Sequence, residues 1–158
     1  MRRTIDFNSG WFFLRWNADA AVVLDTGEAV TLPHTWNAVD GQDGGDDYYR
    51  GTCVYAKRFS RPELAEGEEA WLEFEGVGMT AAVSVNSSPP VRHEGGYSTF
   101  RVQVTADLLD ENILAVSADN GRNRAVYPQK ADFTFYGGIY RDVRLIIVPA
   151  AHFVLDDH

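Results

Sequence analysis

The stretch GTCVYAKRFS, residues 51–60, decides the fold class because its side chains alternate between two faces. Cys53, Tyr55 and Phe59 share one face, on which Lys57 is the single polar residue. A period of two is the pattern of a strand that buries one of its faces. We therefore expect a strand here, with Cys53 as a buried structural thiol.

The same alternation recurs along the chain on both sides of this stretch. In residues 70–76, for example, Leu72 and Phe74 are expected to point inward and Glu73 and Glu75 outward. Further strands are expected at 28–33, 70–76, 80–86, 99–105, 112–119, 140–149 and 152–156. Helical patterns are confined to short pieces at 61–69 and 105–112, and neither is long enough to organise a fold.

About eight short strands at regular spacing, without crossover helices, favour an all-β antiparallel sandwich. An immunoglobulin-like sandwich and a jelly roll are both compatible with this strand pattern. The chain has one cysteine and so lacks the cysteine pair of antibody domains, which favours the jelly roll. Its 158 residues correspond to a single domain, 1–158.

Composition and charge exclude several classes of protein. The net charge is −9 and no cluster of Lys and Arg occurs, which argues against a nucleic-acid or anionic membrane partner. No apolar run approaches the roughly 20 residues of a membrane span. No signal peptide is visible after Met1, so we expect a cytoplasmic location if Met1 is the native start.

Two long loops, residues 34–51 and 119–138, are expected to carry the function, since loops of this length in a compact domain usually do. The first is acidic and rich in glycine, but it lacks the final Glu of a calcium loop of the EF-hand type. The four histidines are widely scattered, and zinc sites prefer closely spaced ligands. We therefore expect no metal site built from this chain alone.

Aromatic side chains gather in or beside the two loops and the strand ends. Rings of this kind pack on the C–H faces of sugars, while carboxylates and amides bind sugar hydroxyls. They also serve simply to close the ends of a sandwich. The residues concerned are Tyr48, Tyr49, Tyr97, Tyr127, Phe133, Phe135 and Tyr136.

Four ordered motifs resemble the N-terminal sugar-binding domain of glycoside hydrolase family 2. They are TLPHTWNAVDGQDGGDDYYRGTCVYAKRF, LEFEGVGMTAAVSVN, HEGGYSTFRVQVTADL and VYPQKADFTFYGGIYRDVRLIIV. The pair DGGDDYYRG and YPQKADFTFYGGIYRDV is most similar to bacterial β-galactosidases. One departure is the sequence VNSSPPVRHEGG, in which Ser87 replaces the glycine usual in the family's hairpin and the turn is expected to be wider.

The resemblance implies a galactose-binding-domain-like jelly roll that precedes an immunoglobulin-like domain and a (β/α)₈ barrel. In that family the catalytic glutamates lie on the barrel, so no residue of this chain is expected to be catalytic. The implied substrate is a galactoside, and the implied partners are the other domains of the parent enzyme. The isolated chain is therefore predicted to be inactive, although the parent is a hydrolase of O-glycosidic bonds.

The resemblance also assigns substrate-binding residues. Asp132, five residues before the GGI turn, matches the aspartate that reaches from this domain to the galactosyl unit in the barrel. A second loop that approaches the sugar matches the region of Asp46 and Asp47, and the choice between these two acids stays open. No cofactor is expected in the domain, but a sodium or magnesium ion is implied in the full-length enzyme.

Two alternatives remain beside a substrate-positioning domain. One is a free-standing carbohydrate-binding module, which a concave aromatic platform on a sheet face would favour. The other is a domain with a purely structural role in packing or oligomerisation, which a large exposed apolar patch would favour.

Overall fold

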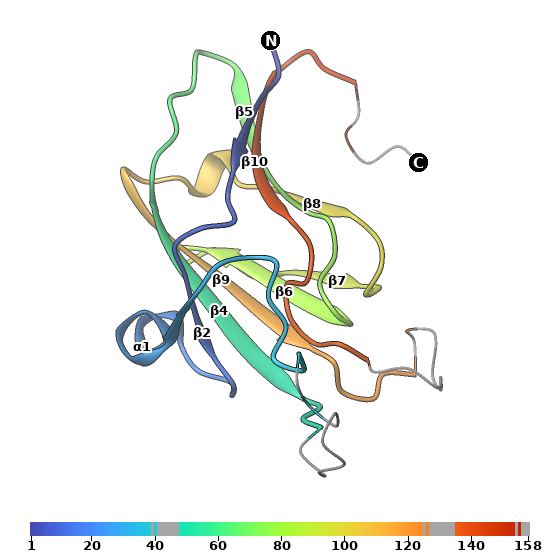
Figure 1. Cartoon of the computed structure of the whole chain (residues 1–158). Coiled ribbons are helices and arrows are strands. Elements are labelled where there is room, and N and C mark those ends of the chain that lie inside the picture. Colours follow the sequence, from blue (N-terminus) through green and yellow to red (C-terminus); the bar gives the residue numbers. More distant parts are fainter. Residues whose placement is uncertain (39, 41–47, 125, 127–134, 154, 156–158) are drawn as a thin grey trace.

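A computed structural model of the chain describes residues 1–38, 40, 48–124, 126, 135–153 and 155. Two antiparallel sheets face each other (Figure 1). The four-stranded sheet has the order β1 (Arg3–Asp6), β10 (Val143–Pro149), β5 (Glu68–Phe74) and β8 (Phe100–Gln103). The six-stranded sheet has the order β3 (Glu28–Val30), β2 (Trp11–Leu14), β4 (Thr52–Ser60), β9 (Glu111–Asp119), β6 (Thr80–Val85) and β7 (Val91–Glu94). The all-β jelly-roll sandwich predicted from the sequence is confirmed.

The alternation in β4 sorts its side chains as predicted. Cys53 and Tyr55 are fully buried between the two sheets. Val54 and Ala56 face outward, yet they are also buried because helix α1 (Ala20–Thr26) covers them with Val23 and Leu24. Figure 1 shows α1 on the outer side of the six-stranded sheet, beside β2 and β4. Burial also raises the pKa of the Cys53 thiol to about 12, which confirms a structural cysteine.

Lys57 is the polar residue on the inward face of β4, and the structure accounts for it. Its ammonium group donates a hydrogen bond to the carbonyl of Ser9 and lies 4.8 Å from the centroid of the Phe7 ring. Burial lowers its pKa, because removal from water disfavours the charged form. A carbonyl and an aromatic face thus take the place of solvent around the charge.

Glu73 was expected to be exposed, and this prediction is wrong. The strand register aligns Asp6, Arg144, Glu73 and Arg101 in one row across the outer face of the four-stranded sheet. Glu73 accepts a hydrogen bond of 2.7 Å from Arg101 Nε and lies 3.5 Å from Arg144 Nη1. The two arginines cover it, so only 6 % of the residue is exposed.

Several short elements also differ from the prediction. The segment 61–69 has no helix, and 105–112 contains only a 3₁₀ turn at Thr105–Asp107. No strand occurs among the described residues of 152–156, where Phe153 is 97 % exposed and has no partner strand. The sequence pattern missed α1, β1, β2 and β7, each of which has seven residues or fewer.

The unusual hairpin after β6 follows the expectation of a widened turn. Asn86 adopts a positive φ of 55° and its amide group donates to Asp107 O and Asn112 Oδ1. Pro89 and Pro90 come immediately before β7, which is an edge strand. An edge position tolerates proline because one side of the strand lacks a partner. In the part of the chain that the structure describes, no helix is long and apolar enough to cross a membrane.

The charged row gives a stability prediction. Glu73→Ala leaves Arg101 and Arg144 without their shared carboxylate and is expected to lower the free energy of unfolding by about 3 kcal/mol. Glu75→Ala is the matched control, since Glu75 also pairs with Arg144 but its side chain is 32 % exposed and should contribute less than about 1 kcal/mol. Urea denaturation followed by circular dichroism measures both values. Equal losses in the two variants would contradict this account.

Candidate functional site

Two buried amides tie together the bases of the two long loops. Asn120, the residue directly after β9, is fully buried. Its Nδ2 donates to Asn37 Oδ1 at 3.0 Å and to the carbonyl of Phe135 at 2.8 Å. Its Oδ1 accepts from the amide of Gly51 at 2.9 Å. One side chain therefore bonds to three separate segments of the chain.

Asn37 continues the same set of bonds. Its Oδ1 accepts a second hydrogen bond, from Gly137 N at 2.8 Å, and its Nδ2 donates to Asp40 Oδ2 at 2.6 Å and to Tyr49 O at 2.9 Å. We call Arg15, Asn37, Asp40, Tyr49 and Asn120 the loop-base network. Buried polar groups that are fully bonded in this way fix a unique geometry, and losing one partner is costly.

Asp40 is the acidic member of the loop-base network. Its carboxylate accepts from Arg15 Nη2 at 3.0 and 3.1 Å and from the Tyr49 amide at 3.2 Å. Burial alone would raise its pKa, but the hydrogen bonds from Asn37, Tyr49 and Arg15 outweigh burial, so the pKa is lowered. Asp40 thus has a structural task, although its sequence suggested a possible cation ligand.

Aromatic residues of the second loop divide into a buried and an exposed set. Phe135 is buried, and its backbone N–H and C=O both bond to Tyr48 Oη, at 2.7 and 2.9 Å. The guanidinium of Arg50 lies 4.7 Å from the Phe135 ring centroid. Tyr136, by contrast, is 46 % exposed. The expected anchoring is therefore confirmed for Phe135 and wrong for Tyr136.

The two glycines that follow are required for different reasons. A Cβ on Gly137 would overlap the indole ring of Trp36. Gly138 has a φ of +116°, and a Cβ there would lie 2.6 Å from both His34 O and Tyr55 Oη. These contacts explain why the chain returns to β10 through a glycine pair.

The three substrate-binding residues predicted from the sequence, Asp46, Asp47 and Asp132, lie outside the described residues, as does Phe133. The structure does describe the residues that bracket them, Asp40 and Tyr48 in one loop and Val126 and Phe135 in the other. Among the described residues, no group of three or more His, Cys, Asp and Glu could hold a metal ion.

Sequence reasoning missed most of the loop-base network. Asn37 and Asn120 were not singled out, and neither was Arg15. The available signal was the position of an asparagine at the end of a strand, where its side chain can bond to local backbone groups. That signal does not reveal a partner such as Asn37, which is separated from Asn120 by 83 residues.

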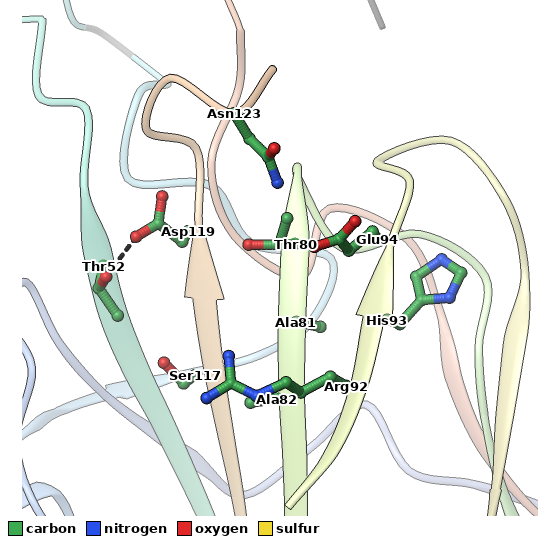
Figure 2. A pocket seen from close by; sticks show the side chains of 10 residues that line it. All are labelled: Thr52, Thr80, Ala81, Ala82, Arg92, His93, Glu94, Ser117, Asp119 and Asn123. Atoms are coloured by element: carbon green, nitrogen blue, oxygen red, sulfur yellow. Dashed lines mark hydrogen bonds between the residues drawn. The ribbon is translucent and has the colours of Figure 1, made fainter. Parts of the chain in front are cut away.

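A polar hollow of about 240 Å³ lies on the outer face of the six-stranded sheet, beyond the area that α1 covers. Figure 2 shows its side chains on β4, β9, β6 and β7, with Asp119 bonded to Thr52. The register places Thr52, Asp119, Thr80 and Glu94 side by side in one row. None of the described residues that line it is Phe, Tyr or Trp. The hollow thus lacks the aromatic platform that a free-standing sugar-binding module would present.

An antiparallel sandwich that joins two long loops at one end through buried side chains is a jelly-roll domain with a loop-borne site. Residues 28–149 match the family described as "Glycosyl hydrolases family 2, sugar binding domain". This chain belongs to that family.

Known relatives carry two kinds of enzyme name. The chain is 41 % identical over 150 residues to a β-glucuronidase of Bacteroides fragilis, covering 92 % of this chain and 21 % of the relative. It is 30 % identical over 160 residues to a β-galactosidase of Thermoanaerobacter pseudethanolicus, covering 96 % and 22 %. The crystal structure of an FMN-binding β-glucuronidase from Faecalibacterium prausnitzii L2-6 superposes with a TM-score of 0.88 at 42 % identity, covering 99 % of this chain and 24 % of that one.

These comparisons bear on the expectation of a β-galactosidase. The chain spans about a fifth of the length of the curated relatives it matches. The identities of 41 % and 42 % belong to β-glucuronidases, whereas the β-galactosidase is at 30 %. The family is shown, and the expected likeness to β-galactosidases in particular is one of two that the relatives display.

The loop-base network predicts a local effect of one amide. Asn120→Ala removes the acceptor of the Gly51 amide and the donor to Phe135 O, so it should destabilise the fold by about 2–4 kcal/mol and accelerate hydrogen exchange at Gly51. Asn112→Ala is the matched control, since Asn112 is a buried asparagine near the opposite end of β9 that bonds to Leu109 and Phe59. Its loss should destabilise the fold without selectively exposing Gly51. Similar exchange patterns in the two variants would contradict the proposed role of Asn120.

Asp40 predicts a component of acid sensitivity. Its pKa is lower in the folded state than in the unfolded chain, so its contribution is fully present above the unfolded value of about 4 and is lost as the pH falls through the lower folded value. Asp40→Asn should therefore be less stable than the wild type at pH 7 but lose less stability between pH 5 and pH 3. Denaturation curves at each pH measure this difference, and parallel pH profiles would refute it.

Proposed function

We propose that this domain is the non-catalytic, substrate-positioning part of a glycoside hydrolase family 2 enzyme. The family match supports a role with sugars, and the chain's share of its relatives supports further domains in a parent protein. The single observation that carries the positioning role is the loop-base network, which fixes the ends of both long loops next to each other. Precise placement of a loop in a neighbouring active site raises the rate by orienting the substrate.

In this proposal Asp132 contacts the sugar, with Asp46 or Asp47 supporting it from the other loop. A carboxylate accepts hydrogen bonds from two sugar hydroxyls at once, which holds the ring in one orientation. The bond-breaking carboxylates belong to another domain of the parent, so the isolated chain hydrolyses no glycoside. The remaining domains of the parent, with an immunoglobulin-like fold and a (β/α)₈ barrel, are the proposed partners.

The substrate proposed for the parent is a β-glucuronide, because the identities of 41 % and 42 % are with β-glucuronidases. A β-galactoside is the second candidate, favoured by the relative from Thermoanaerobacter pseudethanolicus. Comparing hydrolysis of p-nitrophenyl β-D-glucuronide and β-D-galactoside by the parent enzyme separates the two candidates.

A chimera tests the positioning role. Residues 28–149 replace the matching segment of the Bacteroides fragilis β-glucuronidase, and the kcat/KM for p-nitrophenyl β-D-glucuronide is measured. Asp132→Asn in this chimera should lower kcat/KM by about 10- to 100-fold, as expected for the loss of one substrate-orienting group.

Asp25→Asn is the control, because Asp25 is exposed on α1. It should leave kcat/KM unchanged. The proposal is abandoned if Asp132→Asn behaves like the control in a chimera that is active.

A further inference from the structure

A second hollow, unrelated to the polar hollow in Figure 2, lies beside the end of β2. It encloses about 430 Å³ and is lined by the end of β2, by residues around β3 and by residues 34–38. Trp16, which follows β2, lines the hollow and is 58 % exposed. The other three tryptophans are buried or half-buried. A large exposed indole beside a concavity of ligand size is a feature that the fold itself does not require.

Polar groups line the same hollow. Glu28 is exposed and makes no hydrogen bond or ion pair with any described residue. His34 bonds through Nδ1 to Tyr55 Oη at 2.7 Å, which leaves Nε2 for another partner. Thr35 Oγ1 accepts from the amide of Asn37, so its hydroxyl proton remains available. A carboxylate, an imidazole nitrogen and a hydroxyl therefore stand around one aromatic side chain.

This combination fits a sugar ring. The indole can pack on the C–H face of a pyranose, while the carboxylate, imidazole and hydroxyl bond to its hydroxyl groups. We propose that the Trp16 hollow is an accessory binding site for a neutral pyranose. The choice of a sugar as ligand rests on the proposed function, whereas the site itself is separate from the loops that carry Asp46, Asp47 and Asp132.

The charges around the hollow favour a neutral sugar over an acidic one. Arg15 also lines it, but its Nη2 is bound to the Asp40 carboxylate and to Trp36 O. Burial lowers the pKa of His34, so its ring is neutral at pH 7. Glu28 thus remains as the unpaired charge facing the hollow, and it would repel the carboxylate of a glucuronate.

The site also adjoins the loop-base network. Arg15 contributes to the wall of the hollow and holds Asp40, and Trp36 both lines the hollow and donates to Tyr49 O at 3.3 Å. An occupant would therefore touch side chains that position the first long loop. This arrangement suits a subsite for a second sugar unit of a longer glycan.

Direct titration of the 158-residue chain tests the proposal. Methyl β-D-galactoside, lactose and sodium glucuronate are added to roughly 100 mM, a range that covers millimolar affinities, and the indole N–H signals are followed by NMR. The neutral sugars should cause saturable shifts at Trp16, and glucuronate should bind at least several-fold more weakly. No saturable shift at Trp16 with either neutral sugar would overturn the proposal.

Three variants sharpen the test. Trp16→Ala should weaken binding by at least about 10-fold, the loss expected when an aromatic contact worth roughly 1.4 kcal/mol is removed. Glu28→Gln should reduce the preference for neutral sugars over glucuronate, a change that a merely structural role of Glu28 would not cause. Trp71→Phe, on the other sheet, is the control and should leave binding unchanged. Equal affinities in wild type and Trp16→Ala would overturn the proposal.

The outcome separates this inference from the proposed function. Loss of activity in the Asp132→Asn chimera with no sugar bound at Trp16 would refute the accessory site alone. Sugar binding at Trp16 with an unaffected chimera would refute only the positioning role. If the Trp16 indole is instead shielded from iodide quenching in the parent enzyme without any sugar, the hollow is a domain interface and the proposal is wrong.

Discussion

The antiparallel pairing of β4 with β9 is the constraint on which the rest of the structure depends. It runs without interruption from Thr52 opposite Asp119 to Ser60 opposite Glu111. Because the register is fixed over this length, a one-residue slip would turn every inward side chain of β4 toward solvent. The pairing therefore defines which residues form the core and which residues meet at each end of the sheet.

Asparagines near the two ends of β9 use this pairing in the same way. Asn120 bonds to segments that begin both long loops, and Asn112 bonds to the turn and hairpin at the opposite end. Each places a rigid amide where strands give way to irregular chain, so backbone groups that leave the ladder still find partners. The end that carries the long loops differs by having Arg15 and Asp40 as well, and this charged pair adds a further link to the first loop.

Local alternation predicted the strands that are buried on one face, and it failed where a distant residue changes the environment. β4, β6, β8, β9 and β10 were all recognised because their apolar residues repeat with a period of two. Glu73 follows the same period but is covered by Arg101 and Arg144, which come from two other strands. Phe153 has the composition of a strand residue but finds no partner there. In the candidate site, glycine and aromatic positions were readable, whereas the pairing of Asn37 with Asn120 depends on the tertiary fold.

The position of Cys53 has a practical consequence. It lies in the middle of the core on β4, opposite Ala118, and is the only cysteine of the chain. A thiol reagent can reach it only when β4 and β9 separate, since a buried protonated thiol is unreactive. The rate of labelling of the isolated domain thus reports the opening of the central sheet directly, without an added probe. The same absence of disulfides makes the fold indifferent to the redox state of its surroundings.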